Sequence, residues 1–338
     1  MKPTIKDVAA RAGVSIATVS RVMNNRDRVH TATKEKVHRA IEELGFAPST
    51  IARSMVMNET RNIGLLLPFL KNEFWATLAE SIEARLWENG YTVTIGMADS
   101  RSYAKMKAAV QSMIERKADG IILCSSPADP RELADFTKLV VESAVPAVTF
   151  EFDLPGLPSV KSDHIQGSSA AVNHLIRLGH TRIAHIGGPL VSIGRELGYR
   201  EAHLLQGLPV DENLIRRGEP FFEFGQAAII DLLEQEAPFT AVFCANDLIA
   251  LGAVQELQRR EFRIPKDISI IGYDNIKAAV LIKPNLTTIA QPVSDMSASL
   301  VDTLLKEKND KPARRLPPKL LFELELIVRE TTAAPLMS

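Results

Sequence analysis

Residues 4–23 read TIKDVAARAGVSIATVSRVM and determine the fold of the N-terminal part of the chain. Apolar residues recur there at helical spacing until Gly13 interrupts the run, namely Ile5, Val8, Ala9 and Ala12. Ser15 stands where a helix N-cap belongs, so a second helix is predicted to begin at Ile16. A third helix is indicated by Val37, Ile41 and Leu44. Two short helices joined by a Gly-containing turn and packed on a third predict a helix-turn-helix.

The second helix of a helix-turn-helix lies in the major groove of DNA, with its N-terminal residues against the base edges. In this chain those residues are Ile16, Ala17, Thr18 and Arg21. Helical hairpins with a Gly turn also occur in proteins that never touch nucleic acid, so charge is a second criterion. Residues 1–60 carry ten Lys and Arg against six Asp and Glu, a net charge of +4, whereas the remainder carries −5. A basic head on an acidic body favours binding to phosphates.

Composition excludes several other classes of protein. The chain has 338 residues, 46% hydrophobic and 24% charged, which is typical of soluble globular domains. No apolar run approaches the ~18–20 residues of a membrane span. Asp7 and Arg11 interrupt the N-terminal segment, so we expect no export signal and a cytoplasmic protein. Cys124 and Cys244 lie in apolar, strand-like runs, so we expect two buried thiols, with no disulfide, metal site or cofactor.

Several short motifs in the first 54 residues together resemble the head of a LacI/GalR-family repressor. They are TIKDVA at 4–9, AGVS at 12–15, ATVSRV at 17–22, Asn24, TKEKV at 33–37, LGFAP at 44–48 and ARS at 52–54. The resemblance implies a DNA-binding domain at 1–47, and it continues through the whole chain. It implies DNA contacts from Thr4, Ser15, Ile16, Ala17, Thr18, Ser20, Arg21, Asn24, Arg53 and Met55.

Residues 48–60 join the head to the body. The segment Pro48–Met57 forms barely two helical turns and is too short to be stable alone. A plain linker is one interpretation. The resemblance implies instead a hinge helix that orders with its dimer mate in the minor groove, where an apolar side chain wedges a base step open. By position that wedge is Met55, where the family usually has Leu.

From residue 61 onward, short apolar runs alternate with amphipathic segments of helical length. Strands are predicted at 62–68, 91–98, 119–126, 146–150, 182–188, 241–246 and 268–274. Helices are predicted between them at 73–89, 102–117, 131–143, 165–178, 195–205, 225–235 and 247–260. Two such α/β series indicate two Rossmann-like lobes, each a parallel sheet with helices on both faces.

Ligands of open parallel sheets bind beyond the carboxyl ends of the strands. The residues at those ends are Phe74, Trp75, Glu151, Asn246, Asp247 and Asp274, so together they predict a pocket. Each has a structural alternative when taken alone, because Asp247 or Asp163 would also cap a following helix, and Phe74 or Trp75 would also serve as core.

The family resemblance assigns roles to parts of the body. GRELGY at 194–199 is similar to the family's Arg-containing effector motif, AND at 245–247 to its Asn-Asp pair, and GYDN at 272–275 to its Asp-bearing turn. The resemblance implies that Arg195 and Asp274 hold sugar hydroxyls or a comparable polar ligand while an aromatic ring stacks on its flat face. Two positions depart from the pattern: Glu73 replaces a common Pro, and Pro220 replaces a common aromatic, although Phe221 adjoins it and completes the predicted effector set.

The C-terminal part completes the two lobes. Residues 286–292 (LTTIAQP) and the predicted helix 293–306 are similar to the family's return crossing into the first lobe, and residues 324–330 to its final strand. Lobe 1 is accordingly expected at about 61–160 and 291–322, and lobe 2 at about 161–290 and 323–330. No Leu heptads follow Glu330, so a dimer is expected rather than a tetramer.

An enzyme and a free-standing sugar-binding protein are the rival functions. The chain contains no Walker loop, no Gly-x-Ser-x-Gly elbow and no HExxH helix, and its seven His residues are scattered. The basic head argues against a free-standing binding protein. The sequence therefore predicts a ligand-responsive transcriptional regulator that binds a pseudo-palindromic operator as a homodimer, most simply a repressor of a carbohydrate-utilisation operon. A regulator that uses a purine or sugar acid as corepressor is the alternative.

Overall fold

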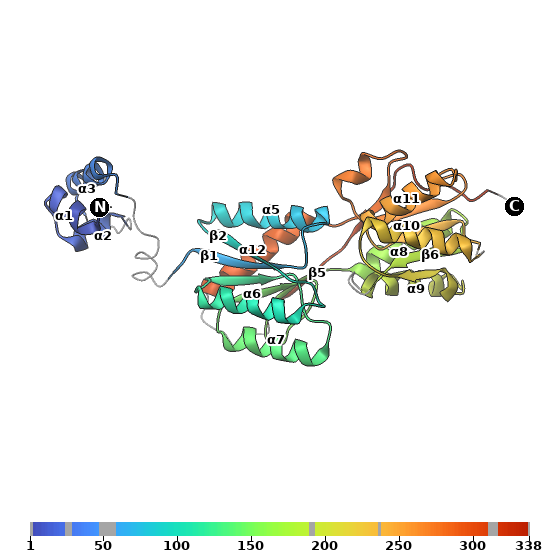
Figure 1. Cartoon of the computed structure of the whole chain (residues 1–338), viewed down its shortest axis with the longest axis horizontal. Coiled ribbons are helices and arrows are strands. Elements are labelled where there is room, and N and C mark those ends of the chain that lie inside the picture. The colour runs from blue at the N-terminus through green and yellow to red at the C-terminus, as the bar shows by residue number, and fades with distance from the viewer. Residues whose placement is uncertain are drawn as a thin grey trace. The chain divides into compact units, whose positions relative to one another are not determined.

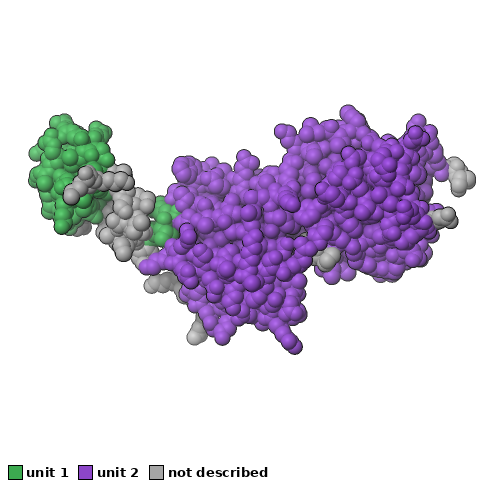
Figure 2. Space-filling view, viewed as in Figure 1, with its two compact units in different colours: residues 1–61 green, residues 62–338 purple. Residues whose placement is uncertain are grey.

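The structure is a computed structural model that describes residues 3–23, 29–46, 59–188, 193–235, 238–309 and 317–336. It divides into two compact units, residues 1–61 and residues 62–338 (Figure 2). The predicted hinge helix at 48–57, with Arg53 and Met55, and the predicted DNA contact Asn24 lie outside the described residues.

The described part of the first unit contains three helices, α1 (Ile5–Ala12), α2 (Ile16–Met23) and α3 (Thr31–Leu44). Gly13 takes the left-handed conformation, with φ of 66°, in which α1 ends and the tight turn to α2 begins. The Ser15 hydroxyl accepts the backbone N–H of Thr18 at 3.1 Å and caps the start of α2. Buried valines from all three helices form the core, namely Val8, Val19, Val22 and Val37. The predicted helix-turn-helix is confirmed.

The second unit contains two six-stranded sheets (Figure 1). The first sheet has the order β11-β5-β4-β3-β1-β2, from β1 (Asn62–Leu67), β2 (Thr92–Met97), β3 (Gly120–Leu123), β4 (Ala147–Phe150), β5 (Ser159–Ser162) and β11 (Lys319–Phe322). The second has the order β12-β10-β9-β8-β6-β7, from β6 (Ile183–Gly187), β7 (Ile215–Arg217), β8 (Ala241–Cys244), β9 (Ser269–Asp274), β10 (Thr287–Ala290) and β12 (Glu325–Ile327). Neighbouring strands pair in parallel except β10 with β12. The predicted α/β architecture of two parallel sheets is confirmed.

Helices cover both faces of each sheet (Figure 1). Around the first sheet lie α5 (Glu73–Glu88), α6 (Tyr103–Glu115), α7 (Pro130–Glu142) and α12 (Val293–Asn309). Around the second lie α8 (His164–Arg177), α9 (Ile193–Leu205), α10 (Phe222–Glu234) and α11 (Asp247–Arg259), with short turns η1 (Glu212–Leu214) and η2 (Lys277–Val280). Successive side chains of β1 point to opposite faces of the first sheet. Leu65 packs toward α5 and α12 on one face, and Leu66 packs toward α6 and α7 on the other. We call each sheet with its helices the first and the second lobe.

The chain crosses between the lobes after β5, after β10 and after β11. Two of the crossings lie close together, because the Ser162 hydroxyl oxygen is 2.8 Å from the side-chain oxygen of Gln291. Four strands were not predicted from the sequence, namely β5, β7, β10 and β11. They are only three or four residues long, and polar residues such as Lys161, Arg216 and Arg217 leave no continuous apolar run. Among the described residues, no helix is long and apolar enough to span a bilayer.

Candidate functional site

Helix α2 presents one face to the core and the other to solvent. Val19 and Val22 are buried, which fixes the rotation of the helix. Ile16, Ala17 and Arg21 are consequently exposed on the opposite side, as a helix that enters the major groove requires.

The remaining described residues predicted to contact DNA take part in local hydrogen bonds. The backbone N–H and hydroxyl of Thr4 each donate to the Asp7 carboxylate at 2.7 Å, forming a capping box at the start of α1. Ser15 and Thr18 hydrogen-bond each other through their hydroxyls at 2.9 Å. Ser20 is half-buried and also has an interaction partner. These contacts order the start of both helices while leaving Thr4 and Ser15 exposed.

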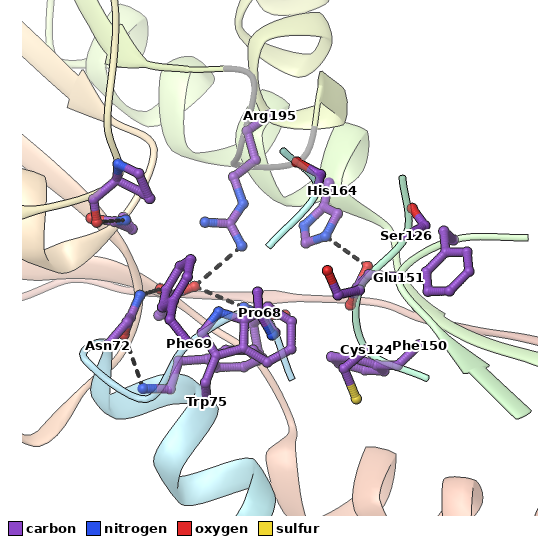
Figure 3. Close-up of a pocket in the computed structure, with 18 of the residues that line it drawn as sticks. Pro68, Phe69, Asn72, Trp75, Cys124, Ser126, Phe150, Glu151, His164 and Arg195 are labelled. Atoms are coloured by element: carbon purple, nitrogen blue, oxygen red, sulfur yellow. Dashed lines mark hydrogen bonds and ion pairs between the residues drawn. The ribbon is translucent and has the colours of Figure 1, made fainter. Parts of the chain in front are cut away.

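A cavity of about 360 Å³ opens at the carboxyl ends of the strands, between the two lobes (Figure 3). This volume suits a small organic ligand. Its lining comprises Pro68, Phe69, Asn72, Phe74, Trp75, Ser100, Cys124, Ser125, Ser126, Phe150, Glu151, Phe152, His164, Ile193, Arg195, Pro220, Asn246, Asp274 and Gln291. The location agrees with the rule for open parallel sheets.

The wall contributed by the second lobe is centred on Arg195. Its guanidinium pairs with the Asp274 carboxylate at 3.2 Å, and both side chains are buried. It also donates to the backbone oxygen of Ala245 and lies over the ring of Tyr273, 3.9 Å from the centroid. The Nε of Arg195 is buried and has no hydrogen-bond partner among the described residues. The guanidinium of this lining residue therefore keeps one donor that no described residue satisfies.

Asp274 is held from both lobes. Its carboxylate accepts hydrogen bonds from Asn72 of the first lobe at 3.3 Å and from Gln291 of the crossing segment at 2.8 Å. Burial raises the pKa of Asp274, and the neighbouring Arg195 opposes that rise. The carboxylate therefore joins three segments that are distant in sequence at one point of the cavity.

A second carboxylate, Glu151, faces the cavity from the end of β4. It pairs with Nε2 of His164 at 2.8 Å and accepts the Ser162 hydroxyl at 2.7 Å. Nδ1 of His164 lies 2.7 Å from the Tyr273 hydroxyl. Burial alone would raise the pKa of Glu151, but His164 and the hydrogen bonds from Ser162 outweigh it, so the pKa lies below its usual value. Glu151 is therefore a negatively charged acceptor.

Both cavity carboxylates belong to residues with strained backbones. Glu151 has φ of 67° and Asp274 has φ of 108°, followed by Asn275 with φ of 55°. Non-glycine residues rarely adopt such angles, which cost about 1–3 kcal/mol each and cluster at ligand clamps. Both strained positions lie where a buried strand ends, β4 before Glu151 and β9 at Asp274.

The wall contributed by the first lobe is aromatic (Figure 3). Trp75 makes edge contacts with Phe69, Phe74 and Phe150, with ring centroids 6.4, 5.2 and 5.9 Å away. Such rings offer flat apolar surface opposite the charged groups.

Six of the eight predicted effector residues line the cavity, namely Phe74, Trp75, Glu151, Arg195, Asn246 and Asp274. Phe221 does not, because its ring packs behind Phe69 at a centroid distance of 5.2 Å, and Pro220 takes the lining position. Asp247 does not either. Its carboxylate is fully buried beneath the cavity, where it binds Thr288 and the backbone of Ile276. Asn246, and not Asp247, caps helix α11.

Three lining residues that bind the cavity carboxylates were not predicted from the sequence. Asn72 is the N-cap of α5, His164 is the first residue of α8, and Gln291 lies between β10 and α12. His164 follows a strand that was not predicted, and Gln291 lies in a crossing segment. Of these three residues, only Asn72 could have been placed from the local sequence, because it stands at the N-cap position directly before a predicted helix.

Neither a metal nor thiol chemistry is indicated. Within the parts of the chain that the structure describes, no group of three His, Cys, Asp or Glu could hold a metal ion. Cys124 and Cys244 are free and buried, and burial raises the pKa of both thiols far above the ordinary value.

Comparison with known proteins agrees with this geometry. Residues 4–49 match the bacterial regulatory proteins of the lacI family, residues 63–189 a periplasmic binding protein domain, and residues 172–332 a periplasmic binding protein-like domain. The chain is 36% identical to the HTH-type transcriptional regulator DegA of Bacillus subtilis (strain 168), over 98% of this chain and 99% of that protein. It is also 36% identical to the HTH-type transcriptional repressor PurR of Vibrio atlanticus (strain LGP32), over 97% and 98%.

Among solved structures, the Lac repressor dimer bound to operator and the anti-inducer ONPF superposes with a TM-score of 0.90 at 27% identity, covering 99% of this chain and 100% of that chain. Helix-turn-helix, two-lobed body and full-length similarity thus agree. The chain belongs to the lacI family of bacterial regulatory proteins and is a ligand-responsive, DNA-binding transcriptional regulator rather than an enzyme.

Proposed function

We propose that this regulator is a cytoplasmic homodimeric repressor that binds a pseudo-palindromic operator and senses a neutral sugar in the cavity, so that it controls a carbohydrate-utilisation operon. The observation that carries the ligand class is the charge balance of the cavity. Arg195 is paired with Asp274, and His164 with Glu151. Among the described lining residues, Arg195 and His164 are the only cationic or potentially cationic side chains.

A ligand with its own negative charge would therefore meet two carboxylates and a guanidinium that is already neutralised. A neutral sugar avoids that repulsion. Its vicinal hydroxyls suit Glu151 and Asp274 as acceptors and the Arg195 guanidinium as a donor, while its apolar face suits Trp75. The strained backbones of both carboxylate residues support the assignment, because such positions cluster at ligand clamps.

A nucleoside or purine is the second candidate, since the aromatic wall of Phe69, Trp75 and Phe150 would also accept a flat base. A thermal-shift screen of the full chain separates these classes. It compares neutral pentoses, hexoses and disaccharides with their phosphate esters and uronic acids, and with nucleosides and purines. We expect a neutral sugar to raise Tm and its charged derivatives to have a smaller effect. A phosphate ester or sugar acid that stabilises more than its neutral parent would contradict the proposal.

DNA recognition is tested separately on the exposed face of α2. Arg21 can pair bidentately with guanine, whereas Ile16 and Ala17 offer only apolar contact, chiefly to thymine methyls. We expect Arg21→Ala to cost about 1–3 kcal/mol on the specific operator and little on random DNA. Equal weakening on both sequences, measured by fluorescence anisotropy at fixed salt, would identify Arg21 as a phosphate contact.

A further inference from the structure

Asp247 lies beneath the cavity and holds the segment that carries Asp274. Its Oδ2 accepts the backbone N–H of Ile276 at 2.9 Å, and its Oδ1 accepts the Thr288 hydroxyl at 2.6 Å. We propose that Asp247 is a positioning residue that fixes the turn 274–276 and thereby directs Asp274 into the cavity. The inference rests on the proposed ligand function of the cavity, and it concerns a residue that does not itself line the cavity.

The turn needs such a restraint because two consecutive residues in it are strained. Asp274 and Asn275 both have positive φ, 108° and 55°, although neither is glycine. Conformations of this kind persist only where the surroundings hold them. Asp247 binds the N–H of Ile276 at the far end of the turn. Thr288, which donates to Asp247, also receives the N–H of Asn275 at 3.4 Å. The Asp247 carboxylate thus holds the turn directly at Ile276 and indirectly at Asn275, through the Thr288 hydroxyl.

Gly272 on β9 makes room for this anchor. A Cβ at Gly272 would lie 2.1 Å from Oδ1 of Asp247, so any larger residue would displace the carboxylate. The residue before Asp247 is Asn246, which lines the cavity and caps the same helix. The start of α11 therefore sets two cavity groups at once: Asn246 directly, and Asp274 through Asp247.

The charges around Asp247 support a hydrogen-bonding role rather than an ion pair. The ionisable groups that interact with Asp247 are Asp274 on β9 and Cys244 at the end of β8, and the backbone of Tyr273 also hydrogen-bonds to its carboxylate. Burial, with a further contribution from the negative charge of Asp274, raises the pKa of Asp247 to about 8. When Asp247 is protonated, its hydrogen bond with Thr288 reverses, so that the carboxyl donates to the Thr288 hydroxyl, while Oδ2 still accepts from the backbone N–H of Ile276. Asparagine offers the same pair of hydrogen bonds, which makes Asp247→Asn the conservative variant.

Hydrogen–deuterium exchange of the full chain without ligand tests the proposal. In Asp247→Ala, we expect the amides of residues 274–276 to exchange about tenfold faster or more, because the turn loses its anchor. Asp247→Asn should restore protection to near the wild-type level. Glu256→Gln is the matched control, since Glu256 is also a buried acid of α11 but pairs with Arg259 and Arg260 away from the cavity. It should leave the turn unchanged.

Two outcomes would overturn the proposal. Unchanged exchange at 274–276 in Asp247→Ala would show that the turn holds itself, and equal acceleration across β8, β9 and β10 would make Asp247 an ordinary core residue. Gly272→Ala is a second variant that displaces the carboxylate without removing it, and it should accelerate exchange in the same turn. If Asp247→Ala does not fold, the contrast between Gly272→Ala and Asp247→Asn decides the question. Because no ligand is used, a failed sugar screen leaves this result intact.

Discussion

The two walls of the cavity stabilise a ligand in different ways. The first lobe contributes aromatic rings, which offer non-directional apolar contact, whereas the second lobe contributes the buried Arg195–Asp274 pair, which offers directed hydrogen bonds. The charged groups also satisfy one another across the crossing segments, and the rings pack against their own helix and strand. The difference predicts that changes in the charged wall disturb the fold and binding together, while changes in the aromatic wall chiefly affect binding.

The largest effect is expected for Arg195→Met. This substitution leaves Asp274 as a buried carboxylate without its cation, so the free energy of unfolding should fall by about 3–5 kcal/mol. It should also abolish ligand binding. The double variant Arg195→Met with Asp274→Leu removes both charges and should recover much of the stability but none of the binding. Urea denaturation of the full chain measures the stability of both variants. A double variant no more stable than the single one would show that the pair matters for packing rather than charge.

The residues that support the charged wall should also respond to pH, because Asp247 titrates there. Its native pKa of about 8 lies above the ordinary value of 3.8, so between these values the folded state keeps a proton that the unfolded state releases. Wild-type stability therefore falls over this window relative to Asp247→Asn, which cannot titrate. We expect the difference in Tm, variant minus wild type, to grow from pH 5 to pH 8 and to level off above. A pH-independent difference would show that Asp247 is ionised throughout.

For the aromatic wall, Trp75→Leu should weaken binding of the sugar found in the screen by about tenfold, or 1.4 kcal/mol, through loss of ring contact. The ligand-free Tm should change little, because Trp75 is only half-buried. Trp87→Leu is the matched control on the same helix, where the side chain is 67% exposed and lies outside the cavity lining. Isothermal titration measures the affinity, and urea denaturation measures the stability. A loss of stability in Trp75→Leu as large as that in Arg195→Met would contradict the comparison.

The smallest effect is expected where the two walls meet at the surface. Arg101 of the first lobe pairs with Glu219 of the second, beside the lining residues Ser100 and Pro220. Both side chains are about half exposed, so the pair should contribute only about 0.2–1 kcal/mol. Arg101→Ala should change ligand affinity a few-fold at low salt and less at high salt. Lys107→Ala, which breaks the pair with Asp135 within the first lobe, should have no effect. A tenfold loss at high salt would make the Arg101 pair an essential closure contact.

The amino-acid sequence by itself determined the head and the architecture of the body. Gly13, Ser15 and the spaced valines specify the helix-turn-helix through contacts only a few residues apart. Alternating apolar runs and amphipathic segments specify the parallel sheets, and strand ends mark where a cavity forms. Glu151 and Asp274 were predicted because each directly ends a buried strand.

Only the tertiary structure decided which of those residues face the cavity. Asn246 and Asp247 are neighbours at one helix start, yet the helical rotation directs one into the cavity and the other beneath it. Asn72 reaches Asp274 across 202 positions of sequence, and His164 and Gln291 arrive through crossings between the lobes. The direction of Asp274 itself depends on a strained turn held from another helix. Local periodicity cannot predict these contacts, because they join residues whose spacing along the chain follows no repeat.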